Sequence, residues 1–154
     1  MKRVLMFAVY VLVGMIALGV TAFSSDKKMK KEATAWPAGD IKWVEAKEGP
    51  PGIMFAPLWG DMSKGAFGTL VKFTAGLDNP LHTHSYTAKL VVISGSFWYA
   101  PEGGEKKMLG PGSYLEVPGG LKHTSGAEAG TVVFQEGSGK WDMKMVEAPK
   151  GMKK

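Results

Sequence analysis

"GLDNPLHTHSYTAKLVVISG", residues 76–95, sets two histidines one residue apart, between a proline-bearing turn and a run of β-forming residues. The third and last histidine of the chain, His123, ends the downstream stretch "GSYLEVPGGLKH". Alternate residues of a strand point to the same face, so His82 and His84 can project together into the interior of a barrel. An imidazole from the hairpin that carries His123 would complete a facial set of three nitrogen donors. Catalytic Zn²⁺ or Fe²⁺ sites need such a set, with positions left open for water or substrate.

The composition around this stretch is typical of one all-β domain. A chain of 154 residues has the length of a single ordinary domain. Its 21 Gly and 9 Pro, among many branched and aromatic residues, favour short strands joined by tight turns. Since the chain contains no Cys, disulfides, thiolate zinc sites and a cysteine nucleophile are excluded.

Nine short apolar stretches lie between turn signals and are predicted strands. No segment past the N-terminal apolar run has the spacing of an amphipathic helix, which disfavours a parallel α/β sheet and predicts a sandwich or barrel. The predicted strands are residues 41–46, 53–60, 66–73, 88–94, 96–100, 106–110, 113–118, 131–136 and 142–147.

The N-terminus has the layout of an export signal. Lys2 and Arg3 precede a long apolar run that ends in small residues, so residues 1–22 are predicted to be a signal peptide or an uncleaved N-terminal membrane anchor. With either outcome the domain lies outside the cytoplasm, in the periplasm or the extracellular space, and any membrane contact is through this segment.

The remaining boundaries follow from composition. Residues 23–35 are polar and lysine-rich and predict a flexible linker, residues 36–148 form the predicted β-barrel domain, and residues 149–154 form a basic tail. No predicted folded stretch concentrates Lys and Arg among stacking aromatic residues, so nucleic acid is not an expected partner.

The two histidine segments together resemble the two motifs of the cupin superfamily, small β-barrels of the jelly-roll kind. Residues 76–95 match the first motif and residues 112–123 the second, with sixteen residues between them. The chain is also similar to cupins grouped as a domain of unknown function and to the cupin part of an anti-sigma factor. The resemblance implies an antiparallel jelly-roll barrel in which His82, His84 and His123 hold a divalent metal ion: Fe, Zn, Mn or Ni.

The chain departs from the cupin pattern at the acidic ligand. In cupins a glutamate four or five residues after the second histidine is the fourth ligand, and this chain has Ala88 and Lys89 at those positions. A protonated Lys89 beside a dication would be repelled by about 4 kcal/mol per pair of unit charges 4 Å apart. Three alternatives stay open: Lys89 points outward, Lys89 loses its proton, or no metal binds. Three-histidine cupins without the glutamate include iron-dependent dioxygenases, so the resemblance still allows a metal site.

Three further residues are candidates for the pocket, namely Lys89, Tyr99 and Gln135. Tyr99 belongs to an aromatic run whose alternate members should line the barrel, where they stack on a ligand or only pack the core. Gln135 is placed to hydrogen-bond a metal-bound water. Its neighbour Glu136 is the nearest acid that could replace the lost ligand, but the two have opposite parity, so only one can face inward.

Two classes of function are compatible with these residues. The first is a metal-dependent oxygenase or lyase that acts on a small anionic molecule, because three neutral imidazoles leave the full charge on the metal ion. The alternative is a non-catalytic small-molecule-binding or sensing cupin without metal, in which the histidines are hydrogen-bonding groups. Both classes have a small molecule as partner, and pairing of two barrels into a homodimer through an edge strand stays open.

Overall fold

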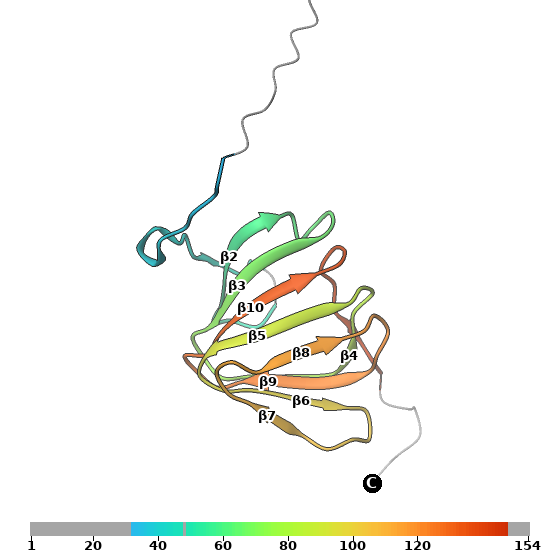
Figure 1. The fold of residues 1–154 in the computed structure, drawn as a ribbon. Coiled ribbons are helices and arrows are strands. Elements are labelled where there is room, and N and C mark those ends of the chain that lie inside the picture. The colour runs from blue at the N-terminus through green and yellow to red at the C-terminus, as the bar shows by residue number, and fades with distance from the viewer. Residues whose placement is uncertain (1–31, 48, 148–154) are drawn as a thin grey trace, which may run out of the picture. The chain divides into compact units, whose positions relative to one another are not determined.

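The computed structural model describes residues 32–47 and 49–147. The predicted signal or anchor segment and the basic tail lie outside the described residues. The described residues from Trp36 onward belong to one compact unit, which is built from two antiparallel sheets (Figure 1). No helix among the described residues is long and apolar enough to cross a membrane.

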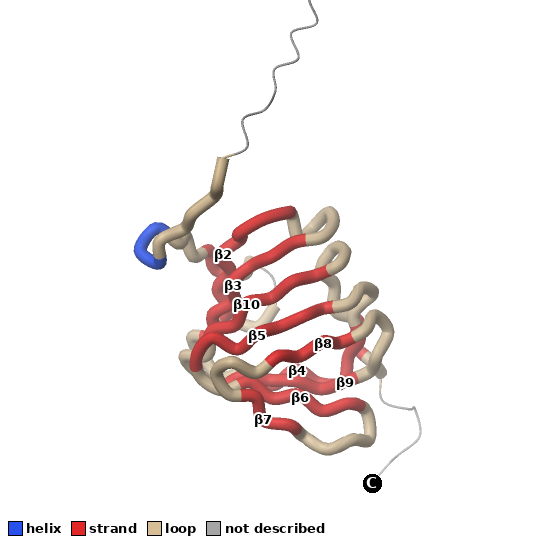
Figure 2. Tube along the Cα trace, in the orientation of Figure 1, coloured by secondary structure: helices blue, strands red, loops and turns tan. Residues whose placement is uncertain are grey.

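The all-β prediction is confirmed, because strands account for nearly all regular structure in the described residues (Figure 2). One sheet has the strand order β1-β2-β3-β10-β5-β8 and the other the order β11-β4-β9-β6-β7. The antiparallel jelly-roll architecture follows from this order. The elements are η1, a 3-10 helix (Ala38–Asp40), β1 (Val44–Glu45), β2 (Ile53–Gly60), β3 (Phe67–Phe73), β4 (Leu77–Thr83), β5 (Ala88–Ser94), β6 (Phe97–Pro101), β7 (Lys107–Leu109), β8 (Tyr114–Val117), β9 (His123–Ala127), β10 (Val132–Gly137) and β11 (Lys144–Met145).

The core lies between the two sheets and consists of inward-facing residues from both. On β10, which is hydrogen-bonded to β3 on one side and β5 on the other, burial alternates along the strand, so Val133 and Gln135 face inward. Val133 is fully buried, and the five-stranded sheet contributes Phe97 and Ala127 to the same cluster. Alternation of this kind is what a strand with one buried face requires.

Two strands, β4 and β9, were absent from the nine apolar stretches that the sequence predicts, and both carry histidines. β4 contains the turn-forming sequence Asp78, Asn79 and Pro80, and its pairing with β9 shifts register between Asn79 and His82. Proline cannot donate a hydrogen bond to a neighbouring strand, so it is tolerated at such an irregularity. β9, with the sequence HTSGA, has Thr124 as its one typical strand former, and it is paired with β4 on one side and β6 on the other.

Two turn glycines adopt the left-handed conformation but differ in the space around them. Gly95 has φ +79° and Gly112 has φ +84°. A Cβ at Gly95 would lie 2.6 Å from the Cα of Thr131, whereas a Cβ at Gly112 would meet no atom within 4 Å. Glycine is therefore required at position 95 both by the left-handed turn and by the close approach of the chain at Thr131, and at position 112 by the left-handed turn alone.

Candidate metal centre

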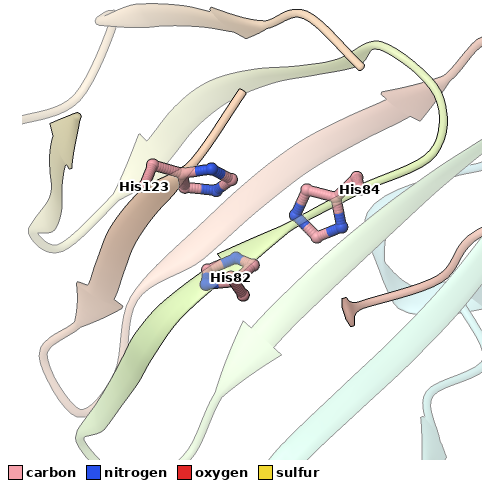
Figure 3. A group of neighbouring side chains, drawn as sticks. All are labelled: His82, His84 and His123. Atoms are coloured by element: carbon pink, nitrogen blue, oxygen red, sulfur yellow. The ribbon is translucent and has the colours of Figure 1, made fainter. Parts of the chain in front are cut away.

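Two neighbouring strands bring the three histidines to one point inside the barrel. His82 lies near the end of β4, His84 follows that strand directly, and His123 begins β9 opposite His82 in register. The ring centroids are 4.1 Å apart for His82 and His123, 4.9 Å for His82 and His84, and 5.3 Å for His84 and His123. All three residues are buried, and one nitrogen from each lies within 4.8 Å of the others (Figure 3).

The second nitrogen of each ring is held by the backbone. Nδ1 of His82 and Nδ1 of His123 each lie against the carbonyl oxygen two residues earlier in the chain, at 2.7 and 3.0 Å. Nδ1 of His84 lies against the carbonyl oxygen of Asp142. Because a carbonyl oxygen only accepts, each Nδ1 must carry the hydrogen and donate it. Nε2 of each ring then keeps a free lone pair, which is the form that binds a metal ion.

Burial keeps two of these rings neutral. It lowers the pKa of His84, and it lowers the pKa of His123 to about 4, with further lowering from the neighbouring histidines. A hydrogen bond to a backbone carbonyl opposes the shift in both residues without reversing it. Both rings are therefore uncharged near neutral pH and do not have to release a proton before they bind a cation.

The segment after β10 fixes the position of His84. Both the backbone N–H and the hydroxyl of Ser85 donate to the carboxylate of Asp142, at 2.7 and 2.6 Å. These hydrogen bonds lower the pKa of Asp142 and tie its backbone to the loop that carries His84. The ring of Trp141 also packs against the ring of His84, with centroids 4.3 Å apart. The orientation of His84 thus depends on residues far away in the sequence.

The prediction that Lys89 lies in the pocket is wrong. Its side chain is 44% exposed, and its ammonium group lies 3.7 Å from the carboxylate of Glu136, which is also exposed. Strand alternation explains this, because β5 turns Ala88 and Leu90 toward the cavity and Lys89 to the outside. Of the two positions at which cupins carry the acidic ligand, the inward one is therefore occupied by Ala88, and no lysine charge opposes a metal ion there.

The other two pocket candidates do line the cavity. Tyr99 on β6 and Gln135 on β10 are largely buried, and both border a cavity of about 500 Å³ that also contains the three histidines. The ring of Tyr99 lies 5.4 Å from that of His123. Gln135 faces inward and Glu136 outward, as their opposite parity requires.

Four polar residues of the cavity were not identified from the sequence. Ser125 lines it two residues after His123, so strand alternation could have indicated this position. Asn79 donates a hydrogen bond to the Ser125 hydroxyl at 3.2 Å across the β4–β9 pair. Trp141 and Asp142 follow β10 in a stretch with no motif, and no local signal connects them with His84.

The donor set fits a divalent transition-metal ion. Three neutral imidazoles present their lone pairs from one side, and the remaining side opens to the cavity. Imidazole ligands suit Zn²⁺, Fe²⁺ and Ni²⁺ rather than Mg²⁺ or Ca²⁺.

The comparisons with known proteins agree with this fold. A family model described as a domain of unknown function (DUF4437) matches residues 7–144. The chain belongs to this family. No curated protein matches it by sequence.

Three solved structures are similar to this member of the DUF4437 family. KdgF from Halomonas sp. is 24% identical with a TM-score of 0.57, over 72% of this chain and 97% of that one. The polyketide cyclase RemF from Streptomyces resistomycificus is 19% identical with a TM-score of 0.59, over 77% and 89%. A Ralstonia eutropha protein of unknown function with a cupin-like fold is 29% identical with a TM-score of 0.57, over 71% and 74%. The expected cupin-like fold is confirmed.

Proposed function

We propose that this DUF4437 protein binds a divalent transition-metal ion through Nε2 of His82, His84 and His123, and that it acts as a lyase or oxygenase on a small anionic molecule held in the cavity. The observation that carries the proposal is the convergence of three imidazoles whose Nδ1 atoms are all bound to backbone carbonyls. These hydrogen bonds from Nδ1 fix the tautomer and the direction of each ring, as the corresponding hydrogen bonds of metal-binding histidines generally do.

The charges around the histidines favour an anionic ligand. Three neutral ligands leave the full charge of the ion uncompensated, since Ala88 stands where cupins carry a glutamate. The carboxylate of Asp142 is occupied by two hydrogen bonds from Ser85. A bound ion would supply Lewis acidity that polarises an oxygen atom of the substrate. A carboxylate or enolate oxygen meets this requirement better than a neutral group.

Two polar side chains are placed to orient such a molecule. Gln135 and Tyr99 both line the cavity, and the amide of Gln135 can donate as well as accept a hydrogen bond. Burial raises the pKa of the Tyr99 phenol, so at neutral pH it stays protonated and offers an O–H donor to the substrate. Neither residue is a strong base, so proton abstraction is not the role we assign to them.

A Co²⁺ spectrum tests this proposal. Co²⁺-loaded protein should change its d–d absorption when pyruvate is added and should not respond to the same concentration of acetone, its uncharged counterpart. Gln135→Ala should weaken the pyruvate response, whereas Glu136→Ala, its outward-facing neighbour, should leave it unchanged. A spectrum that does not change with any small carboxylate would contradict the assignment of an anionic ligand.

The second candidate function is a non-catalytic binding or sensing cupin, and the absence of an acidic ligand at Ala88 favours it. Turnover separates the two functions. If Fe²⁺-, Mn²⁺-, Ni²⁺- and Zn²⁺-loaded protein all bind a keto acid without consuming it or taking up oxygen, the binding function replaces the enzyme function.

We also propose that the chain is exported, with the barrel in the periplasm or outside the cell. The support is the sequence of the N-terminal segment, with Lys2 and Arg3 before an apolar run. N-terminal sequencing of native protein from fractionated cells should give a start near Phe23, or the intact N-terminus in the membrane fraction. Full-length chain in the soluble cytoplasm would refute export.

A further inference from the structure

The cavity continues from the histidines into the barrel, and the strand registers order its lining. On β9, successive inward residues are His123, Ser125 and Ala127, which lie opposite His82, Asn79 and Leu77 of β4. At about 3.3 Å per residue, His123 and Ala127 are roughly 13 Å apart along the strand. This length gives three successive levels, which we call the histidine level, the polar level and the apolar level.

The polar level is defined by Asn79, Ser125, Tyr99 and Gln135. Tyr99 lies opposite Ser125 in the β6–β9 pair, and Gln135 lies opposite Leu90 in the β5–β10 pair. Asn79 and Ser125 are hydrogen-bonded to each other. Among the described residues, no side-chain hydrogen bond within the protein involves Tyr99 or Gln135, so both are available to a molecule in the cavity.

The apolar level lies on the side of the polar level away from the histidines, at the Leu77–Ala127 end of the β4–β9 pair. Four of its residues come from four different strands, and each lines the cavity: Phe55 of β2, Val71 of β3, Leu77 of β4 and Phe97 of β6. Phe55 lies opposite Val71 in the β2–β3 pair, and Phe97 and Leu77 both lie opposite Ala127 of β9. No charged side chain of the described residues lines this level, because the one charged residue of the cavity lining is Asp142, next to His84.

We infer that the site takes a small carboxylate or enolate whose body is an aryl or branched alkyl group, and that it rejects polyhydroxylated sugar acids. The inference rests on the proposed function, because the anionic head would lie at the histidine level. A keto or hydroxyl group next to the head would reach Gln135 and Tyr99, and the apolar body would lie against Phe55, Val71 and Phe97. A sugar acid would place several hydroxyl groups against an apolar wall without hydrogen-bond partners, which is unfavourable.

Three probe acids test the inference on Co²⁺-loaded protein: phenylpyruvate, pyruvate and glucuronate. Phenylpyruvate and pyruvate share the same head and differ by an aryl body. Burial of a phenyl group should make phenylpyruvate bind roughly ten- to a hundredfold more tightly than pyruvate. Glucuronate should bind no more tightly than pyruvate. Equal affinities for phenylpyruvate and pyruvate, or tighter binding of glucuronate, would overturn the inference.

Variants of the apolar level localise the effect. Phe55→Gln should remove most of the preference for phenylpyruvate over pyruvate, while Phe55→Leu should keep most of that preference. Ile93→Gln, on the exposed face of β5, is the matched control and should change neither affinity. A preference that survives in a folded Phe55→Gln protein would contradict the placement of the body. If Phe55→Gln does not fold, Phe55→Leu must lower the preference by a measurable factor, or the placement fails.

Failure of the proposed metal site can be distinguished from failure of the inference about the ligand body. If Co²⁺ does not bind, the metal site is refuted, and the apolar body is then tested on the metal-free protein by dialysis of 3-phenylpropionate against propionate. The phenyl acid should still bind more tightly. If it does not, the inference fails as well.

Discussion

The pair Ala88→Glu and Lys89→Glu tests which residue occupies the place of the missing acidic ligand. Ala88 lines the cavity that contains the histidines, and Lys89 lies on the outer face of the sheet beside Glu136. The two variants add the same carboxylate at adjacent positions of one strand. We expect Ala88→Glu to tighten Zn²⁺ binding and Lys89→Glu to leave it unchanged.

The expected size follows from charge and burial. A carboxylate about 4 Å from a dication gains roughly 8 kcal/mol at an effective dielectric constant of 20, twice the value for a pair of unit charges. Burial of that carboxylate costs several kcal/mol of solvation. A net gain of about 1–3 kcal/mol remains, which is roughly a ten- to hundredfold lower dissociation constant.

The two variants should also differ in metal-free stability, for different reasons. Ala88→Glu places a carboxyl group beside the buried Val117, its neighbour on β8, and should lower the free energy of unfolding by about 1–3 kcal/mol. Lys89→Glu sets its carboxylate opposite Glu136 on β10 and opposite Glu116 on β8, and each of these like-charge pairs should cost about 0.2–1 kcal/mol.

Zn²⁺ titration calorimetry with a competing chelator, together with urea unfolding of metal-free protein, measures both quantities. Equal tightening of Zn²⁺ binding by Lys89→Glu and Ala88→Glu would refute the outward placement of Lys89, because Lys89 would then have to face the metal.

Three further predictions concern His84, pH and the turns. Asp142→Ala should weaken Zn²⁺ binding about 10- to 100-fold in calorimetry, since Asp142 fixes the segment whose carbonyl orients His84, while Lys144→Ala, exposed beside it, should not. Because the folded-state pKa of His123 is lowered to about 4, the stability of the metal-free protein should be constant above pH 6.5 and should fall as the pH is lowered from 6.5 to 4. In this range the unfolded chain binds a proton at His123 and the folded chain does not. A constant melting temperature between pH 6.5 and 4 would contradict this prediction. Gly95→Ala should lower the free energy of unfolding by at least 1 kcal/mol more than Gly112→Ala, because its Cβ would also clash with Thr131. Gly112→Ala carries only the strain of a left-handed backbone, about 1–2 kcal/mol. Equal losses of stability in urea unfolding would refute this difference.

The spacing of the histidines, together with the resemblance to the two cupin motifs, predicted that they meet. Strand alternation places His82 and His84 on one face, and the pairing of β9 with β4 places His123 opposite His82. Strand alternation also predicted that Gln135 and its neighbour Glu136 face opposite sides of the sheet. The predictions of which residues share a face succeeded because the alternation of side chains along one strand is local and independent of the rest of the fold.

The orientation of Lys89 could not be predicted, because β5 has apolar residues on both faces. Leu90 and Val92 are buried and Ile93 is exposed, although all three are apolar. The pattern of apolar residues therefore does not indicate which face of this strand points inward. Its parity is set by pairing with β10 and β8. The hydrogen bond from His84 to Asp142 spans 58 residues and has no local signal at all.

The central claim is that His82, His84 and His123 together hold one divalent metal ion, and the most direct measurement is a Zn²⁺ titration of metal-free, untagged protein. The structure leads us to expect one ion per chain and at least a hundredfold loss of affinity in each of His82→Ala, His84→Ala and His123→Ala, with Lys89→Met unchanged as the control. Wild-type affinity in His84→Ala, or no saturable binding by the wild-type protein, would contradict the claim.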